Sequence, residues 1–422
     1  MAARACLALG LGAMLAGCST PAPPPGPPTV YGPSLAMQVT ASPPFDLATV
    51  AMDAVAGDIA ADGRAHLLVR PKGSSQVQHR VVGPAGVGRR WVPAFEASGS
   101  LAVAFDEAGV LHAVAGRQHR VMRDGVWSEA QPGPPCLKLV RSGVSLYCGY
   151  LTGGDRFGQG WRIDLWPLMA PVPVPARIHK LVLACLGSEG WADVAVVEPA
   201  LDRDTYQFAF AGDDGGALHV LYAWSRGMMF GKTGVSSAWL PPVVDCDERV
   251  RAGKLAAMAG ETVFNSLADQ VGYVFDVAAD PGTGTSLNIG AFAGTTLEVF
   301  LRQSDRIGTT QLMETPDRRG PRFVGPVRAG AAGDDRFQVL VADTKFGSMV
   351  STLYHLAFRD GAWSSPLAVG DTPTGILHND AVQLFVDRRG NALAVWPEGT
   401  KSTLLRARWV VLPHGHPQRA EP

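Results

Sequence analysis

The sequence has few charged residues and almost no net charge. Of its 422 residues only 18% are Asp, Glu, Lys or Arg, and the formal net charge is −1. A nucleic-acid-binding chain carries a basic footprint, and a disordered chain combines low hydrophobicity with high net charge, so neither class fits. Long helices are disfavoured too, because the chain contains 49 Gly and 32 Pro. The hydrophobic share of 46% is ordinary for a folded protein, so these exclusions leave a turn-rich, all-β fold.

Long hydrophobic runs are also missing. The longest candidate, residues 5–16, is about a dozen residues long, whereas a membrane-spanning helix needs roughly 20. It follows Arg4 and fits the apolar region of a secretory signal peptide. Its end, Leu-Ala-Gly-Cys at residues 15–18, resembles the lipobox of bacterial lipoprotein signal peptides. An ordinary secreted protein that is cut elsewhere is the alternative interpretation.

The lipobox resemblance implies cleavage after residue 17 and a membrane anchor on Cys18. Residues 1–17 are then the signal peptide, and Cys18 carries a diacylglyceryl thioether and a palmitate-type acyl chain on its new amino terminus. Several acyl chains on one residue give stable anchoring. In that family an Asp after the cysteine marks inner-membrane retention, and here the residue is Ser19. The resemblance therefore implies the outer membrane of the cell envelope, with the protein facing the periplasm or the cell surface.

A proline-rich segment follows the predicted anchor. Residues 20–34 read TPAPPPGPPTVYGPS, which favours an extended polyproline II spacer. At about 3.1 Å per residue, it would hold a domain roughly 45 Å from the lipid. We therefore expect a lipidated tether at 18–38, a folded domain at 39–412 and a disordered tail at 413–422.

Cysteine is scarce, but its positions are informative. Cleavage would remove Cys6 and lipidation would use Cys18, which leaves Cys136, Cys148, Cys185 and Cys246. An even number in an oxidising compartment favours disulfides, with three connectivities open. Residues 136–148 read as a hairpin with its two cysteines equidistant from Ser142, so we predict Cys136–Cys148 and, by remainder, Cys185–Cys246. Zinc is not expected, because no CxxC or clustered Cys/His spacing is present.

A tight-turn motif followed by an apolar strand recurs along residues 39–412. The pattern D-x-x-G opens at Asp106, Asp213 and Asp387, and a partial copy lies at 63–69. Tryptophans follow at several copies, and the hexamers RDGVWS at 123–128 and RDGAWS at 359–364 differ at one position.

The spacing of these copies predicts a β-propeller. His66 and His112 are 46 residues apart, and Trp127 and Trp363 are 236 apart, or about five steps of 47. Repeats of this length with short strands and an aromatic residue per unit are typical of propeller blades. The domain length then gives about seven blades, with six or eight as alternatives.

The D-x-x-G strand followed by D-G-x-W-S resembles the sialidase-like, BNR-type bacterial propellers, and 387–397 looks much like their blade motif. Residues 136–190 and 248–330 depart from the pattern, and 249–259 is a candidate short helix. Enzymes of this group use an arginine cluster, a Tyr/Glu pair and an acidic general acid/base. Their stricter S-x-D-x-G-x-T-W box is missing here, so the resemblance assigns no catalytic residue.

Other candidate sites receive mainly structural interpretations. Asp213-Asp214 and Asp334-Asp335 are more typical of turns than of paired catalytic acids, and Asp245–Glu248 more typical of a disulfide-tethered turn than of a calcium site. His66, His112 and His219 share one register and are expected to be buried strand residues rather than a functional ring. Residues 228–230 are a core strand or an adhesive loop, and His414 and His416 belong to a frayed terminus.

The sequence therefore favours a non-catalytic, outer-membrane-anchored propeller over an enzyme. We expect it to be a monomer without cofactor or metal, to contact the membrane through its lipid, and to bind a protein or glycan, not nucleic acid, at the loops around its central channel. A divergent sialidase-like glycoside hydrolase or lyase is the alternative. Clustered arginines and paired carboxylates at the channel mouth would favour the enzyme.

Overall fold

The computed structural model describes residues 39–84, 90–152, 179–197, 203–226, 233–252, 256–258, 260–266, 274–291, 296–303, 306–307, 311–314, 322–345, 350–359, 362–373, 382–398 and 404–412. All of them belong to one compact unit, Gly32–Pro422, and a separate unit, Met1–Tyr31, lies outside the described residues. Within the described part, no helix is long and apolar enough to span a membrane.

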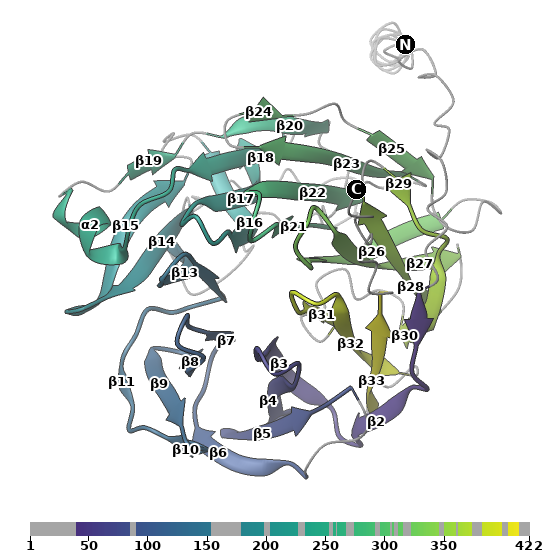
Figure 1. Cartoon of the computed structure of the whole chain (residues 1–422), viewed down its shortest axis with the longest axis horizontal. Helices are drawn as coiled ribbons and strands as arrows, with labels where there is room; N and C mark the ends of the chain where they lie inside the picture. The colour runs from purple at the N-terminus through teal and green to yellow at the C-terminus, as the bar shows by residue number, and fades with distance from the viewer. Residues whose placement is uncertain are drawn as a thin grey trace, which may run out of the picture. The chain divides into compact units, whose positions relative to one another are not determined.

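The described residues form a seven-bladed β-propeller, as predicted (Figure 1). Blade 1 comprises β3 (Met52–Ile59), β4 (Ala65–Pro71), β5 (Gln76–Val82) and β6 (Val92–Glu96). Blade 2 comprises β7 (Leu101–Phe105), β8 (Leu111–Ala115), β9 (Gln118–Arg123), β10 (Val126–Trp127) and β11 (Gln131–Pro132). Blade 3 comprises β12 (Lys138–Ser142), β13 (Ser145–Thr152), β14 (Lys180–Gly187), β15 (Gly190–Val197) and the later strand β19 (Ala256–Met258). Blade 4 comprises β16 (Arg203–Gly212), β17 (Leu218–Arg226), β18 (Thr233–Leu240) and β20 (Glu261–Ser266).

The remaining three blades complete the ring. Blade 5 comprises β21 (Val274–Ala279), β22 (Thr285–Ala291), β23 (Thr296–Gln303), β24 (Arg306–Ile307) and β25 (Gln311–Glu314). Blade 6 comprises β26 (Arg322–Ala331), β27 (Phe337–Lys345), β28 (Val350–Arg359), β29 (Ala362–Trp363) and β30 (Leu367–Pro373). Blade 7 joins β31 (Gln383–Val386), β32 (Asn391–Glu398) and β33 (Leu404–Val411) to β1 (Thr40–Ala41) and β2 (Phe45–Ala48) from the start of the domain.

The first strand of each blade lies innermost, around the propeller axis. These strands contact one another in chain order, and β31 closes the circle against β3. The turns that connect first and second strands also contact their neighbours. For example, Gly143 N donates to Asp213 O at 2.7 Å between blades 3 and 4, and Asp335 N donates to an Asp280 carboxylate oxygen at 2.8 Å between blades 6 and 5. We call the side of the propeller that carries these turns the turn face.

Hydrophobic clusters between neighbouring blades form the core. Trp409 and Leu67, for instance, share one cluster that joins blades 7 and 1. A close contact at the blade 6–7 interface requires glycine, because a Cβ on Gly370 would overlap the buried ring of Trp396. Each blade therefore packs mainly on its neighbours, as expected for a radial repeat.

The blades are less regular than the sequence spacing suggests. His66 and His112 do lie in consecutive blades, on β4 and β8. However, Trp127 on β10 and Trp363 on β29 are four blades apart, so the expected five steps of 47 residues were wrong. The reason is that connections in the middle of the chain are long. Between β13 and β14, for example, 26 residues (153–178) lie outside the described part.

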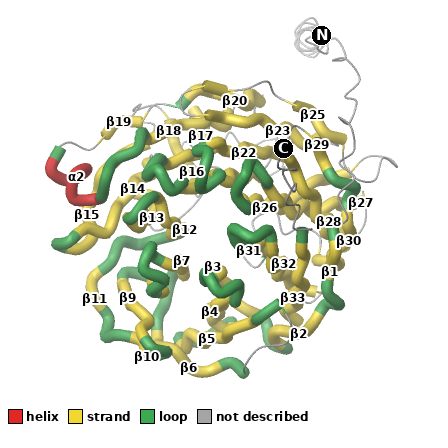
Figure 2. The backbone as a smooth tube through the Cα atoms, viewed as in Figure 1, coloured by secondary structure: helices red, strands yellow, loops and turns green. Residues whose placement is uncertain are grey.

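One connection of blade 4 leaves its own blade. After β18, the chain forms a short helix, α2 (Cys246–Arg251), adds β19 as a parallel strand beside β15 of blade 3, and returns to blade 4 as β20 (Figure 2). The expected helix at 249–259 therefore begins earlier and ends at Arg251.

Two disulfides involve blade 3, and they are the two predicted pairs. Cys136 is bonded to Cys148, and Cys185 of blade 3 to Cys246 of α2. The predicted hairpin geometry was wrong, because Leu139 rather than Cys136 lies opposite Cys148. The hairpin turns at residues 143–144, and Cys136 reaches its partner from just before the strand.

Candidate functional site

The aspartate that opens a D-x-x-G turn holds that turn together. The Asp106, Asp213 and Asp387 carboxylates each accept the backbone N–H four residues later, at 2.7, 2.9 and 2.8 Å. In the equivalent turn of blade 6, Asp334 and Asp335 adopt positive φ angles of 55° and 52°. These geometries agree with the turn interpretation of both Asp-Asp pairs, since Asp is one of the residues that tolerates left-handed backbone.

An ion cluster lies near the axis on the turn face. Asp214 Oδ1 accepts from Arg141 Nη2 of blade 3 at 2.8 Å and also from Arg388 Nη2, which reaches over from blade 7. Burial raises the pKa of Asp214, Arg141 lowers it, and nearby carboxylates, among them Asp280 and Glu107, raise it. Two arginines therefore bind one carboxylate in a surrounding that is otherwise acidic.

Two further carboxylates lie on the innermost strands. Asp276 on β21 accepts from Lys138 Nζ at 3.2 Å and from Ala329 N of the next blade at 3.0 Å. Asp58 on β3 accepts from Phe105 N of blade 2 at 2.9 Å. Burial raises the pKa of Asp58 to about 6 despite its backbone donors. Both carboxylates thus link one blade to the next.

This arrangement limits the chemistry of the axis. Glycoside hydrolysis commonly uses two carboxyl groups facing a sugar, one of them as a proton donor. The Asp58, Asp214 and Asp276 carboxylates are each bound to protein donors instead. Among the residues that the structure describes, no group of His, Cys, Asp and Glu side chains fits a metal ion either.

The three histidines of one register lie on second strands, not on the innermost ones. His66 contacts His79 at 3.2 Å within blade 1, and His112 contacts His119 at 3.0 Å within blade 2. His219 is almost fully buried on β17. They are strand residues as expected, with His112 and His219 buried and His66 partly buried.

These pairs also contact the following blade. The His79 and His119 rings meet Trp127 of blade 2 and Trp191 of blade 3 edge-on. Burial lowers the pKa of both histidines to about 4, so both are neutral at pH 7. The pairs therefore belong to the interfaces between blades.

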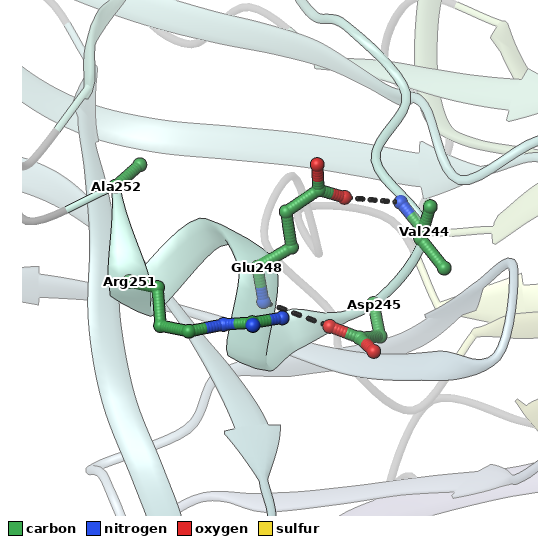
Figure 3. A pocket seen from close by; sticks show the side chains of 5 residues that line it. All are labelled: Val244, Asp245, Glu248, Arg251 and Ala252. Atoms are coloured by element: carbon green, nitrogen blue, oxygen red, sulfur yellow. Dashed lines mark hydrogen bonds between the residues drawn. The ribbon is translucent and has the colours of Figure 1, made fainter.

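The segment around α2 forms an open pocket of about 570 Å³ (Figure 3). Its lining is Val244, Asp245, Glu248, Arg251 and Ala252. Asp245 Oδ1 caps the helix by accepting from Glu248 N at 2.7 Å, and Glu248 Oε2 accepts from Val244 N at 2.8 Å. As expected, the acidic run at 245–248 is a disulfide-tethered turn, here the start of a helix.

Several predicted features lie outside the described residues. These are the signal peptide, Cys18 with its tether, the segment 228–230, and the tail with His414 and His416. Conversely, Lys138, Arg141 and Asp276 belong to none of the sequence motifs considered above and were not predicted. Arg388 and Asp214 do lie inside D-x-x-G turns, those that begin at Asp387 and Asp213.

Comparison with known proteins finds distant structural similarities and no relative by sequence. No family model and no curated protein matches the chain. The polysaccharide lyase Uly1 aligns with a TM-score of 0.48 and 10% identity, covering 93% of this chain and 94% of its own. The six-bladed fucose lectin of Aleuria aurantia aligns at 0.44 and 12% (79% and 98% covered), and the Penicillium chrysogenum α-L-arabinanase at 0.41 and 9% (72% and 94% covered). The lectin is a six-bladed β-propeller, and these similarities at low identity assign no function to the chain.

Proposed function

We propose that this chain is a lipid-anchored β-propeller of the bacterial cell envelope that binds a protein or glycan ligand without catalysing a reaction. The lipobox-like sequence ending at Cys18 and the proline-rich tether support the anchor and the outer-membrane location. The propeller supports a binding role, since its loops surround one axis and offer a broad contact surface.

The observation that carries the non-catalytic role is the ion cluster at the axis. Asp214 is bound by Arg141 and Arg388, so these arginines are paired to the protein and not gathered around an open site. These two ion pairs connect blade 4 to blades 3 and 7.

The topology shows at which face of the propeller the described part of the chain begins. Thr40, the first strand residue after the tether, pairs with Val411 at the end of β33. That end lies on the turn face, because Leu412 N donates to Gly390 O of the blade 7 turn at 3.1 Å. The described part of the chain therefore begins at the turn face, and the loops that link second to third strands lie on the opposite face.

Metabolic labelling tests the anchor. In a host that processes lipoproteins, the wild type should incorporate labelled palmitate and Cys18→Ser should not, with Cys6→Ser as the matched control that stays labelled. Labelling that survives Cys18→Ser would refute the anchor.

A glycan array together with a turnover assay tests the binding role. We expect saturable binding by the wild type and no product from a panel of glycosides and polysaccharides. Turnover that disappears in Asp276→Asn, with binding retained, would instead make the protein a hydrolase or lyase.

A further inference from the structure

The segment that carries α2 and β19, between β18 and β20 of blade 4, is held on the turn face by contacts with blade 3. Cys246 is bonded to Cys185, and Asp247 Oδ1 accepts from Ser188 N at 3.0 Å. Arg249 donates to the Tyr147 hydroxyl at 2.8 Å. These contacts fix a segment that blade 4 does not need for its own strands, so the segment forms an added, preorganised surface.

This surface exposes aliphatic side chains. Val244 is 78% exposed and Val250 43%, on either side of the start of α2. Val144, 50% exposed, precedes Ser145, whose hydroxyl accepts from Cys246 N at 2.9 Å, so the turn at Val144 lies next to the start of α2. We call Val144, Val244 and Val250 the valine patch. A rigid segment that turns valines outward leaves apolar surface for a partner to bury.

An acidic rim surrounds the patch. Asp245, Asp247 and Glu248 lie in or next to the first turn of α2, and exposed Glu189 follows the Ser188 that Asp247 binds. Hydrogen bonds from Ser188 lower the pKa of Asp247, which keeps it ionised at neutral pH. Among the described residues of this segment, Arg249 and Arg251 on α2 are the cations beside these four carboxylates, so the described rim is net negative.

We propose that the valine patch and its acidic rim dock a segment of a partner protein in which aliphatic residues are flanked by Lys or Arg. Such a segment buries its apolar side chains on the valines and places its cations against the rim. A second copy of this chain in a symmetric dimer would bring two acidic rims together, and an anionic lipid surface would meet the same repulsion. The inference stands on the described residues alone and does not depend on the lipid anchor.

Fluorescence anisotropy of a labelled probe tests the docking surface. The probe is a twelve-residue peptide of alternating Lys and Leu, titrated with the full-length protein in detergent, and a Glu/Leu peptide of the same length is the charge control. We expect saturable binding of the Lys/Leu peptide that weakens at least tenfold between 50 and 500 mM salt, because salt screens exposed charges. The Glu/Leu peptide should not bind.

Variants locate the binding. Val244→Asp and Glu189→Lys should each weaken binding at least fivefold, whereas Val126→Asp, at a valine that is 70% exposed on blade 2, should leave it unchanged. Denaturation curves check that the variants fold. Equal loss in Val126→Asp, no loss in Val244→Asp, or no saturable binding would refute the proposal. Self-association that Val244→Asp abolishes, or equal binding to phosphatidylglycerol vesicles, would replace the partner with a second copy or with the membrane.

Discussion

His355 predicts a measurable loss of stability in acid. The side chain is fully buried on β28, and its Nε2 lies 2.8 Å from Gln338 Oε1, which indicates that Nε2 carries the proton. Gln338 in turn donates to Gly390 O of blade 7 at 3.1 Å. Within the described residues Nδ1 has no partner, so a proton added there has nothing to bind.

The pKa difference sets the magnitude. Burial lowers the pKa of His355 from 6.5 to about 3 in the folded protein. Between these values the unfolded chain takes up a proton that the folded chain refuses, so stability is full above pH 6.5 and falls as the pH is lowered. Between pH 7 and pH 4.5 there are about 2 pH units over which only the unfolded chain binds this proton, which lowers the free energy of unfolding by about 2.7 kcal/mol.

Guanidinium denaturation of the wild type and His355→Gln, followed by tryptophan fluorescence at pH 7 and pH 4.5, measures this contribution. Glutamine does not titrate, so the variant should lose about 2–3 kcal/mol less than the wild type between the two pH values, whatever its stability at pH 7. Val126→Ser, at an exposed site, should follow the wild type. Equal losses in His355→Gln and the wild type would refute the argument.

Three other changes have calculable effects. The pH dependence of stability that Asp58 contributes is opposite to that of His355. Its pKa is raised to about 6 in the folded protein, so the folded chain takes up a proton at mildly acidic pH and is stabilised there. Asp58→Asn removes this stabilisation and should lose about 2 kcal/mol more than the wild type between pH 6.5 and 4.5 in the same assay. Gly370→Ala should cost about 1–3 kcal/mol in chemical denaturation by forcing a methyl group against Trp396, and a neutral result would mean that the interface yields. Replacing Cys185 and Cys246 by Ser opens a closed loop with a separation of 61 residues and should cost about 4 kcal/mol, whereas a loss below about 1 kcal/mol would contradict the chain-entropy argument.

Local features of the fold could be predicted from the sequence because each is written in adjacent residues. A D-x-x-G turn is specified by an Asp whose side chain accepts an N–H four residues on, and the copies at 106, 213 and 387 all form such turns. The repeated turns and strands then imply a propeller. The blade lengths could not be read in the same way, since long connections between strands leave no periodic trace.

The ion pairs around the axis could not be predicted, for a different reason. Lys138 and Asp276 are 138 residues apart, and Asp214 and Arg388 are 174 apart. Such partners meet only when the ring closes, and closure depends on the number of blades and the tilt of each one. A single arginine next to a turn motif carries no sign of which distant carboxylate it will bind.

Ring closure also explains why charges occur near the axis of a chain that has so few. The inner edge of each first strand has no further strand to pair with, so its N–H groups need other acceptors. Asp58 and Asp276 supply them, each accepting from the first strand of the following blade, at Phe105 N and Ala329 N. Because each bond spans two blades, it forms only in the assembled ring. Asp58 and Asp276 therefore each connect one blade to the next through a backbone N–H near the axis.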